Sequence, residues 1–188
     1  MKKLAAAAAA LALLAPAAAH AQPVTTYGGA GPDTYLNLQL GAFVPQSDDL
    51  DAFDPGVAFS GTFGALFTKN LGVEATLGYY RADAGDARVG VVPFLVSLRL
   101  VAPLKVAELS ARAGGGIHFA SSSVDAPFDV SERDTTFGFH VGAAAGFNLS
   151  RTMTFGVDVL RTFANASFGG GDVDIGGLLA TVQLGYKF

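Results

Sequence analysis

The feature that most constrains this chain is a repeated alternation of apolar residues with small or polar ones. Eight segments show it, each with apolar side chains at every second position and with turn residues on either side. These segments cover about residues 35–44, 57–67, 71–80, 89–101, 109–119, 136–147, 153–163 and 176–188. A period of two residues places one set of side chains on each face of a β-strand. The pattern therefore predicts an all-β protein, and beyond residue 21 no apolar run reaches the 18 residues that suggest a membrane helix.

The first 21 residues differ in composition from the rest. Lys2 and Lys3 form a basic start, residues 4–14 form an unbroken apolar run, and residues 19–21 read Ala-His-Ala. This order is typical of a secretory signal peptide, so residues 1–21 are expected to be cleaved before Gln22 after export through the Sec pathway. Residues 22–33, rich in Gly, Pro and Thr, are interpreted as a periplasmic lead-in, and residues 34–188 as one barrel domain.

Charge and cysteine content exclude several functional classes. The chain has 16 acidic and 12 basic residues, and Lys2 and Lys3 belong to the predicted leader. With no basic patch, nucleic-acid binding is not expected. The absence of cysteine excludes a disulfide framework and a thiolate metal site. The glycine run at residues 169–171 is followed by no predicted helix, so it forms no phosphate site, and no cofactor is expected.

Alternation alone fits both a soluble barrel, with an apolar interior, and a membrane barrel, with an apolar exterior. The polar face here is mostly Gly, Ser, Thr and Ala, which suits a narrow lumen better than a water-exposed surface. Four long connections, at residues 45–56, 81–88, 120–134 and 164–174, hold 12 of the 16 acidic residues. The three short connections each carry one basic residue: Lys69, Lys105 and Arg151. Loops sorted by length and charge predict an eight-stranded antiparallel up-and-down transmembrane β-barrel.

The last five residues alternate again and include two aromatic side chains, Tyr186 and Phe188. Together with the strand pattern, this motif resembles the small outer-membrane β-barrel family, which includes OmpA-like, OmpX-like and OmpW-like proteins. The resemblance covers about residues 34–188. It implies a location in the outer membrane of a Gram-negative-type bacterium and recognition of Tyr186 and Phe188 by the barrel assembly machinery. Aromatic residues near the strand ends, among them Tyr35 and Phe43, are expected to form the two interfacial girdles.

The interior of an eight-stranded barrel is roughly filled by its own side chains. The inward charges Glu74, Arg99, Arg112 and Asp158 are predicted to pair as a buried ion network, because buried charges need partners. A gated ion path is the alternative. A narrow OmpW-like path for a small apolar solute is a second alternative, and the inward apolar positions that would line it are Leu66, Pro93, Leu95, Leu160 and Leu179.

Neither histidine of the barrel has the sequence context of a known catalytic site. His118 and His140 are predicted to face the lumen. Lipid A deacylases, which are also small barrels, carry a His-x-Ser-Asn segment. Here the serine, Ser121, lies one place later and the asparagine is absent, so a lipid A-modifying enzyme is only a minor alternative. We expect no enzyme activity.

The acidic loops contain two Asp-x-Asp pairs, Asp49 with Asp51 and Asp172 with Asp174. Carboxylate oxygens suit divalent cations, but the spacing of a full calcium loop is absent. We therefore predict a solvated acidic rim and no metal site, with weak divalent bridging to lipopolysaccharide as the alternative. The sequence as a whole predicts a monomeric, non-enzymatic barrel with a structural or surface-interaction role and both ends in the periplasm. Its expected partners are outer-membrane lipid, lipopolysaccharide and the assembly machinery.

Overall fold

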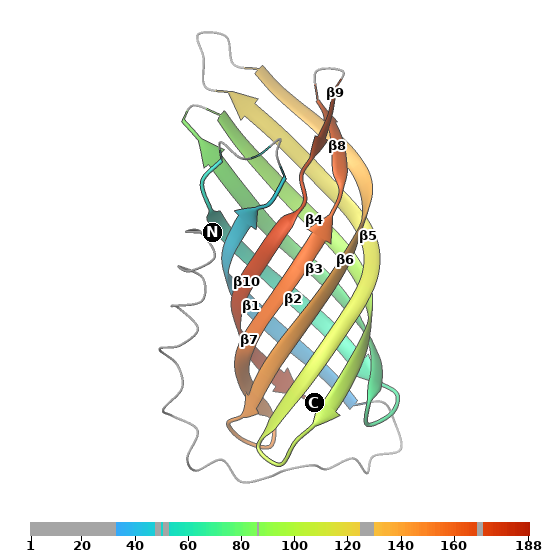
Figure 1. Ribbon diagram of the computed structural model, residues 1–188. Coiled ribbons are helices and arrows are strands. Elements are labelled where there is room, and N and C mark those ends of the chain that lie inside the picture. Colours follow the sequence, from blue (N-terminus) through green and yellow to red (C-terminus); the bar gives the residue numbers. More distant parts are fainter. Residues whose placement is uncertain (1–32, 48–49, 51–52, 86, 125–129, 169–170) are drawn as a thin grey trace.

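The computed structural model describes residues 33–47, 50, 53–85, 87–124, 130–168 and 171–188. Strands account for most of this part of the chain (Figure 1). None of the described residues lies in a helix long and apolar enough to cross a membrane. The predicted leader and most of the lead-in lie outside the described residues.

Eight strands close into one antiparallel barrel in the order β1-β10-β7-β6-β5-β4-β3-β2. Strands β1 and β10, the first and last along the chain, complete the cylinder, with Leu40 opposite Val182. The barrel strands are β1 (Asp33–Pro45), β2 (Gly56–Leu66), β3 (Leu71–Ala84), β4 (Ala87–Pro103), β5 (Ala107–Val124), β6 (Val130–Asn148), β7 (Met153–Phe163) and β10 (Gly177–Lys187). The predicted eight-stranded barrel is confirmed, because each of these eight strands pairs with a neighbour on both sides and the sheet closes on itself.

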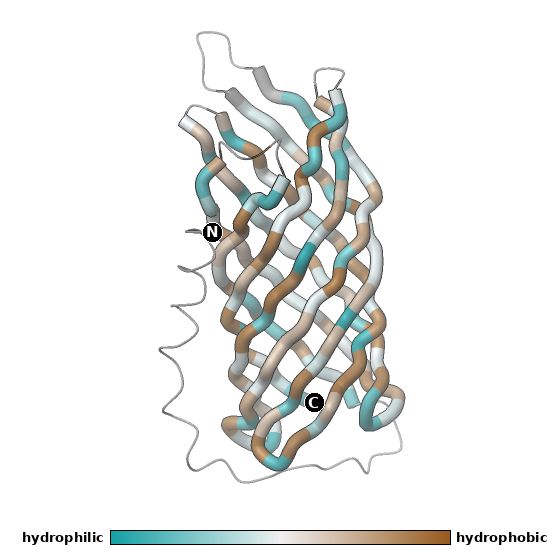
Figure 2. The backbone as a smooth tube through the Cα atoms, in the orientation of Figure 1, coloured by the Kyte–Doolittle hydropathy of each residue, from teal (hydrophilic) through white to brown (hydrophobic). Residues whose placement is uncertain are grey.

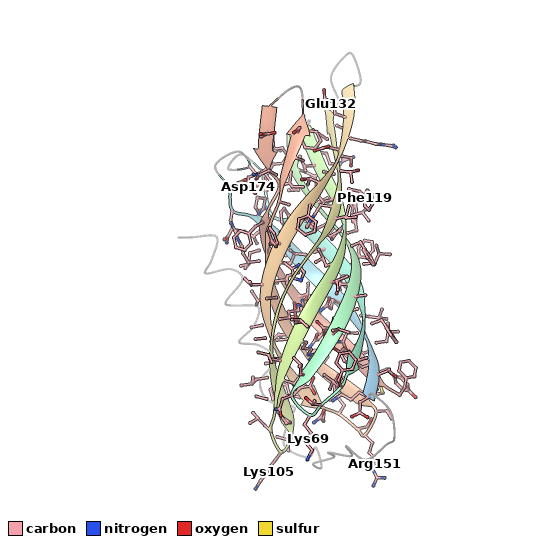
Figure 3. The ribbon with its side chains drawn as sticks, turned by 90° about the vertical axis from the view of Figure 1, so that its right-hand side faces the viewer. Lys69, Lys105, Phe119, Glu132, Arg151 and Asp174 are labelled. Carbon is pink, nitrogen blue, oxygen red and sulfur yellow. The ribbon has the colours of Figure 1, made fainter. Side chains whose placement is uncertain are left out.

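The two ends of the barrel differ. Short connections at residues 67–70, 104–106 and 149–152 lie at one end, which we call the turn end; the other connections lie at the loop end. The chain enters and leaves the barrel at the turn end, where the Phe188 amide donates to the Thr34 carbonyl oxygen at 2.9 Å. Figure 3 shows Lys69, Lys105 and Arg151 at this end, and Glu132 and Asp174 at the other. The described residues thus keep the predicted sorting of charge.

Three of the four long connections are shorter than predicted, because strand structure continues into them. β5 and β6 extend to Val124 and Val130, and β3 and β4 are joined at Gly85, whose φ of 55° is the left-handed turn conformation that glycine adopts without strain. Residues 164–174 contain a separate hairpin of β8 (Asn165–Phe168) and β9 (Gly171–Asp174). The apolar alternation stops at the edge of the lipid-facing belt. Backbone hydrogen bonds between neighbouring strands do not require lipid, so the strands continue beyond that edge.

The outward face of the barrel is apolar and the inward face is small or polar. Leu38, Phe63 and Leu98 are all more than half exposed, whereas Glu74, Thr76 and Ser97 are buried. Figure 2 shows the resulting alternation of hydropathy along the strands. This is the arrangement of a membrane barrel.

The prediction that Tyr35 and Phe43 belong to the aromatic girdles is wrong. Both occupy inward positions of β1 and are buried, at 4% and 2% exposure, because they share the face of Asn37 and Gln39. Other predicted girdle residues are exposed on the outside: Phe67, Phe147, Tyr186 and Phe188 toward the turn end, and Phe59, Phe119 and Phe163 toward the loop end.

Candidate functional site

Charged side chains from four strands meet inside the barrel. Glu74 of β3 lies between two arginines: its Oε1 is 2.7 Å from Nη1 of Arg99 on β4, and its Oε2 is 3.6 Å from Nη1 of Arg112 on β5. Arg112 also donates through Nη2 to Oδ1 of Asp158 on β7, at 2.7 Å. The structure therefore brings together the four residues that the sequence nominated as lumen charges.

Three further residues extend this group toward the turn end. Arg99 donates through Nη2 to Glu108 Oε1 at 3.0 Å, and Lys187 Nζ lies 2.8 Å from Glu108 Oε2. The Tyr35 hydroxyl donates to Glu74 Oε1 at 2.7 Å. We call these seven residues the ion network: Tyr35, Glu74, Arg99, Glu108, Arg112, Asp158 and Lys187.

Sequence reasoning missed Glu108 as a network member because the predicted strand began at Leu109, whereas β5 begins at Ala107. The alternation could have identified it. Glu108 lies four residues before Arg112 on the same strand, so both side chains point inward. Tyr35 was also on the inward face of its predicted strand, but its aromatic ring was assigned to the girdle.

Glycines leave room for the two long guanidinium groups. Arg99 and Arg112 face each other across the β4–β5 ladder, and the residue on the other side of each is a glycine, Gly72 on β3 and Gly142 on β6. Because glycine has no side chain, each arginine extends over its neighbouring strand toward a carboxylate.

The ion network is balanced in charge. Its three carboxylates, on Glu74, Glu108 and Asp158, face three cations, on Arg99, Arg112 and Lys187. The Glu74 side chain has no exposed surface. Removing one partner from such a buried set leaves an uncompensated charge, which typically costs about 3–5 kcal/mol.

Uncharged polar pairs fill the lumen beside the ion network. The Thr62 and Thr76 hydroxyls lie 2.8 Å apart, and the Ser60 hydroxyl donates to the side-chain oxygen Oε1 of Gln39. Ser97 Oγ and His140 Nε2 share a hydrogen bond of 2.7 Å.

Toward the loop end the lumen is closed by apolar side chains, which we call the apolar cap. At its centre the rings of Phe43 and Tyr80 stack with centroids 4.3 Å apart. The buried members of the cap are Phe43, Leu50, Ala58, Tyr80, Ala82, Val89, Val91, Leu95, Ala120, Leu160, Ala164, Ala166, Ile175 and Leu179. Ala164 and Ala166 lie in the segment predicted as a loop, residues 164–174, so this segment helps to close the barrel.

Of the five apolar residues nominated for a solute path, four are packed in apolar clusters and the fifth, Pro93, lines a small cavity. Leu95, Leu160 and Leu179 belong to the apolar cap, whereas Leu66 packs with Tyr35 and Val101 near the turn end. A cavity of about 20 Å³ lies between the apolar cap and the ion network, lined in part by Tyr80, Leu95, Leu160, Arg112 and Asp158. That volume accommodates one water molecule.

The two histidines face the lumen, as predicted, and are buried at 0% and 1% exposure for His118 and His140. Ser121, however, lies three residues after His118 on β5 and therefore on the opposite face. Its hydroxyl donates to the Gly90 carbonyl oxygen at 3.2 Å. His118 and Ser121 therefore do not form a nucleophile–base pair, which requires the two side chains to touch.

Two of the four aspartates nominated for divalent cations, Asp172 and Asp174, lie in the described part of the chain. Asp49 and Asp51 lie outside the described residues. On β9, Asp172 Oδ1 accepts from Ser167 Oγ at 2.8 Å, and Asp174 Oδ1 accepts from the Gly176 amide at 2.8 Å. Within the described part of the chain, no three His, Cys, Asp or Glu side chains gather closely enough to hold a metal ion.

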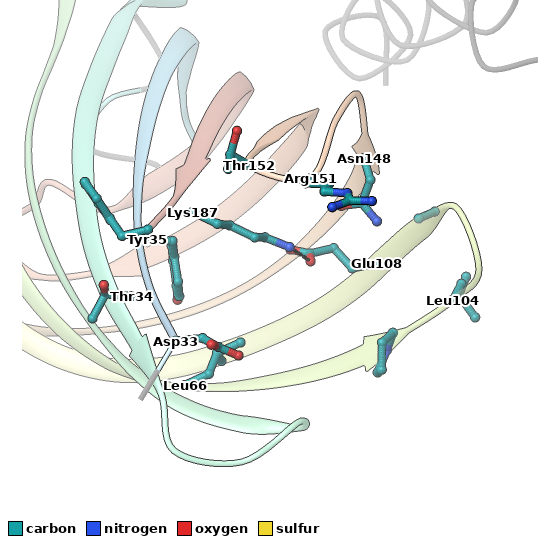
Figure 4. A pocket seen from close by; sticks show the side chains of 13 residues that line it. Asp33, Thr34, Tyr35, Leu66, Leu104, Glu108, Asn148, Arg151, Thr152 and Lys187 are labelled. Atoms are coloured by element: carbon teal, nitrogen blue, oxygen red, sulfur yellow. Dashed lines mark hydrogen bonds and ion pairs between the residues drawn. The ribbon is translucent and has the colours of Figure 1, made fainter. Parts of the chain in front are cut away.

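A cavity of about 270 Å³ opens at the turn end, beneath the ion network (Figure 4). Charged side chains of both signs line it, from Asp33, Glu108, Arg151 and Lys187. The two residues of the predicted assembly motif lie beside this opening: Tyr186 points outward, and its ring meets that of Phe188 edge to face at 5.1 Å.

Comparison with known proteins adds to this geometry. Residues 5–188 match the family described as outer membrane protein beta-barrel domain. Among solved structures, outer membrane protein OprG from Pseudomonas aeruginosa is similar with a TM-score of 0.60 and 17% identity, over 86% of this chain and 98% of that one.

Two further structures have a similar fold. Neisserial surface protein A has a TM-score of 0.58 and 12% identity, over 86% of this chain and 99% of that one. A major outer membrane protein from Thermus thermophilus has a TM-score of 0.58 and 13% identity, over 84% and 99%. No curated protein sequence matches the chain. At these identities the structural likeness concerns the fold.

Proposed function

From the premise that the chain belongs to the outer membrane protein β-barrel family, we propose that it is a closed, non-enzymatic barrel with a structural or surface-interaction role. The family places it in the outer membrane of Gram-negative bacteria. What the barrel does there is inferred from its lumen and its two ends.

The observation that carries the proposal is the filling of the lumen at two successive levels. The ion network occupies the half near the turn end, and the apolar cap occupies the half near the loop end. An ion crossing the barrel would have to part the Phe43–Tyr80 stack and then separate paired buried charges. Both steps are costly, because protein interiors are close-packed and buried charges need their partners.

The proposed orientation places the turn end in the periplasm and the loop end outside the cell, the usual arrangement of short turns and longer loops. The proposal includes export of residues 22–188 after removal of a Sec signal peptide, and assembly guided by the exposed rings of Tyr186 and Phe188. The barrel acts as a monomer, with its loop end turned toward lipopolysaccharide and neighbouring surfaces.

Single-channel conductance tests the proposal. The refolded protein is inserted into planar lipid bilayers, and insertion is verified by protease protection of the barrel strands. We expect no discrete openings from the wild-type protein, while a large-pore porin in the same bilayers gives clear steps. Clear and reproducible openings of the wild type would overturn the structural role.

Uptake of a small apolar solute into liposomes tests the narrow-path alternative, whose support is the apolar side chains Leu95, Leu160 and Leu179 in the lumen. We expect uptake at the rate of protein-free liposomes. Lipid A mass spectra from cells with and without the protein test the enzymatic alternative, and we expect an unchanged acyl count.

A further inference from the structure

One arginine lies on the lipid-facing surface of the barrel. Arg161 occupies an outward position of β7, where Asp158, Leu160 and Thr162 point inward. Its cross-strand partners are Val141 on β6 and Leu178 on β10, and the next outward residues of its own strand are Val159 and Phe163. A cation is thus surrounded on four sides by apolar side chains of the membrane belt.

Among the described residues, the guanidinium of Arg161 has no partner of opposite charge. Nη1 donates to the Gln46 side-chain oxygen at 2.8 Å, and the group lies 5.2 Å from the Phe163 ring centroid. No described carboxylate forms an ion pair with Arg161. A lone cation at the lipid surface is costly, so its presence points to an anion supplied by the membrane.

A groove lies on the same surface, on the turn-end side of Arg161. It has a volume of about 240 Å³, and its outward-facing side chains come from β1, β10 and β7: Leu38, Leu40, Phe155, Val182 and Leu184. Arg161 and the groove therefore share one face of the barrel. One cross-strand row separates Arg161 from the groove. It consists of Ala42, Ala180 and Val159, whose short side chains project little from the barrel surface.

Other outward positions near the loop end are also basic. Arg81 and Arg88 flank Asp83, at 3.5 and 2.8 Å, and Arg133 occupies an outward position of β6. Among the described barrel strands, Asp83 is the one acidic residue at an outward-facing position. The acidic rim predicted from the loops is therefore bordered, on the membrane side, by a surface of positive charge.

We propose that Arg161 and this groove form a binding site for the lipid A anchor of one lipopolysaccharide molecule. A phosphate group sits on the guanidinium, which matches phosphate geometry, and an acyl chain lies in the groove. Gln46 holds the guanidinium in place for the incoming phosphate. The proposal rests on the orientation inferred above, in which the loop end faces the outer leaflet.

Binding of bisphosphorylated lipid A to the refolded protein in detergent micelles tests the site, with native mass spectrometry as the readout. We expect Arg161→Gln to weaken binding about tenfold, the loss of a hydrogen bond between charged groups. The matched control is Arg151→Gln, which removes the same charge at the turn end and is expected to leave affinity unchanged. Ala180→Leu fills the row between phosphate and acyl chain and is expected to weaken binding about fourfold.

The source of the phosphate is tested in parallel. Dephosphorylated lipid A is expected to bind the wild type and Arg161→Gln equally, and phosphatidylglycerol is expected to compete poorly. Equal lipid A affinity of the wild type and Arg161→Gln would overturn the site, as would an equal loss in Arg151→Gln. Competition by phosphatidylglycerol at the same concentration as lipid A would overturn the assignment to lipopolysaccharide.

Foldedness is checked for each variant by far-ultraviolet circular dichroism, and Gln46→Ala provides a second variant that retains the cation. We expect Gln46→Ala to weaken binding about threefold, through the loss of one neutral hydrogen bond. Failure of the proposed function can be distinguished from failure of this lipid site. The former appears as conductance of the wild-type protein, which leaves these lipid affinities unaffected.

Discussion

Arg99 and Arg112 lie directly opposite each other in the β4–β5 ladder, and both guanidinium groups reach the carboxylate of Glu74. Like charges at directly opposite positions destabilise an antiparallel pair. Here the shared carboxylate, together with Glu108, Asp158 and Lys187, turns the repulsion into a neutral network. The stability of the lumen therefore depends on Glu74 more than on any single arginine.

Glu74→Gln is expected to lower the free energy of unfolding by about 3 kcal/mol, because two buried cations lose their common partner. Urea unfolding in lipid vesicles measures the change. Asp83→Asn is the control: it also removes a carboxylate shared by two arginines, but its side chain is 41% exposed, so a loss of about 1 kcal/mol or less is expected. Equal losses in the two variants would contradict the buried network.

Gly64→Ala is expected to destabilise the barrel by about 1–3 kcal/mol, because the added methyl group would overlap the Tyr35 ring. Displacing the ring also breaks its hydrogen bond to Glu74. Gly61→Ala is the control on the same strand, since the nearest atom to its added methyl would be Leu38 Cδ2 at 3.9 Å. In a Tyr35→Leu background the cost of Gly64→Ala should shrink, and an unchanged cost would show that Tyr35 is not the cause.

Phe43→Ala is expected to cost about 3–5 kcal/mol, because it removes half of the stacked pair at the centre of the apolar cap. Phe59→Ala provides the comparison: Phe59 is 54% exposed to lipid, and its truncation leaves no internal cavity. Chemical denaturation in vesicles separates the two. A larger loss for Phe59→Ala would contradict the assignment of Phe43 to the interior.

Phe188→Ala is expected to slow assembly by the purified assembly machinery several-fold while changing the unfolding free energy little. The ring is 72% exposed, so its contribution to packing is small. Phe67→Ala, also exposed and near the turn end, is the control for a general loss of interfacial aromatic surface. Equal assembly rates for the wild type and Phe188→Ala would remove the proposed assembly role.

Strand alternation predicted the barrel well, because a two-residue period and the scarcity of inward charge are local properties of the chain. The same reasoning placed Glu74, Arg99, Arg112 and Asp158 on inward faces, which parity alone determines. It ended β5 too early and began β6 too late, since the limit of the apolar stripe marks the membrane belt and not the limit of backbone pairing. It also moved Tyr35 and Phe43 outward, because an aromatic residue near a strand end suggests a girdle.

The sequence by itself determined two things. One is the face of the sheet on which a strand side chain lies, and the other is the end of the barrel at which a connection lies. Both follow from short-range order: alternation sets the face, and successive antiparallel strands set the end. Only the tertiary structure decided which residues meet. Register and strand tilt bring Glu74 to two arginines, set Gln46 beside Arg161 from 115 residues away, and place that arginine above a groove formed by three strands. Such contacts depend on closure of the sheet, which no single strand encodes.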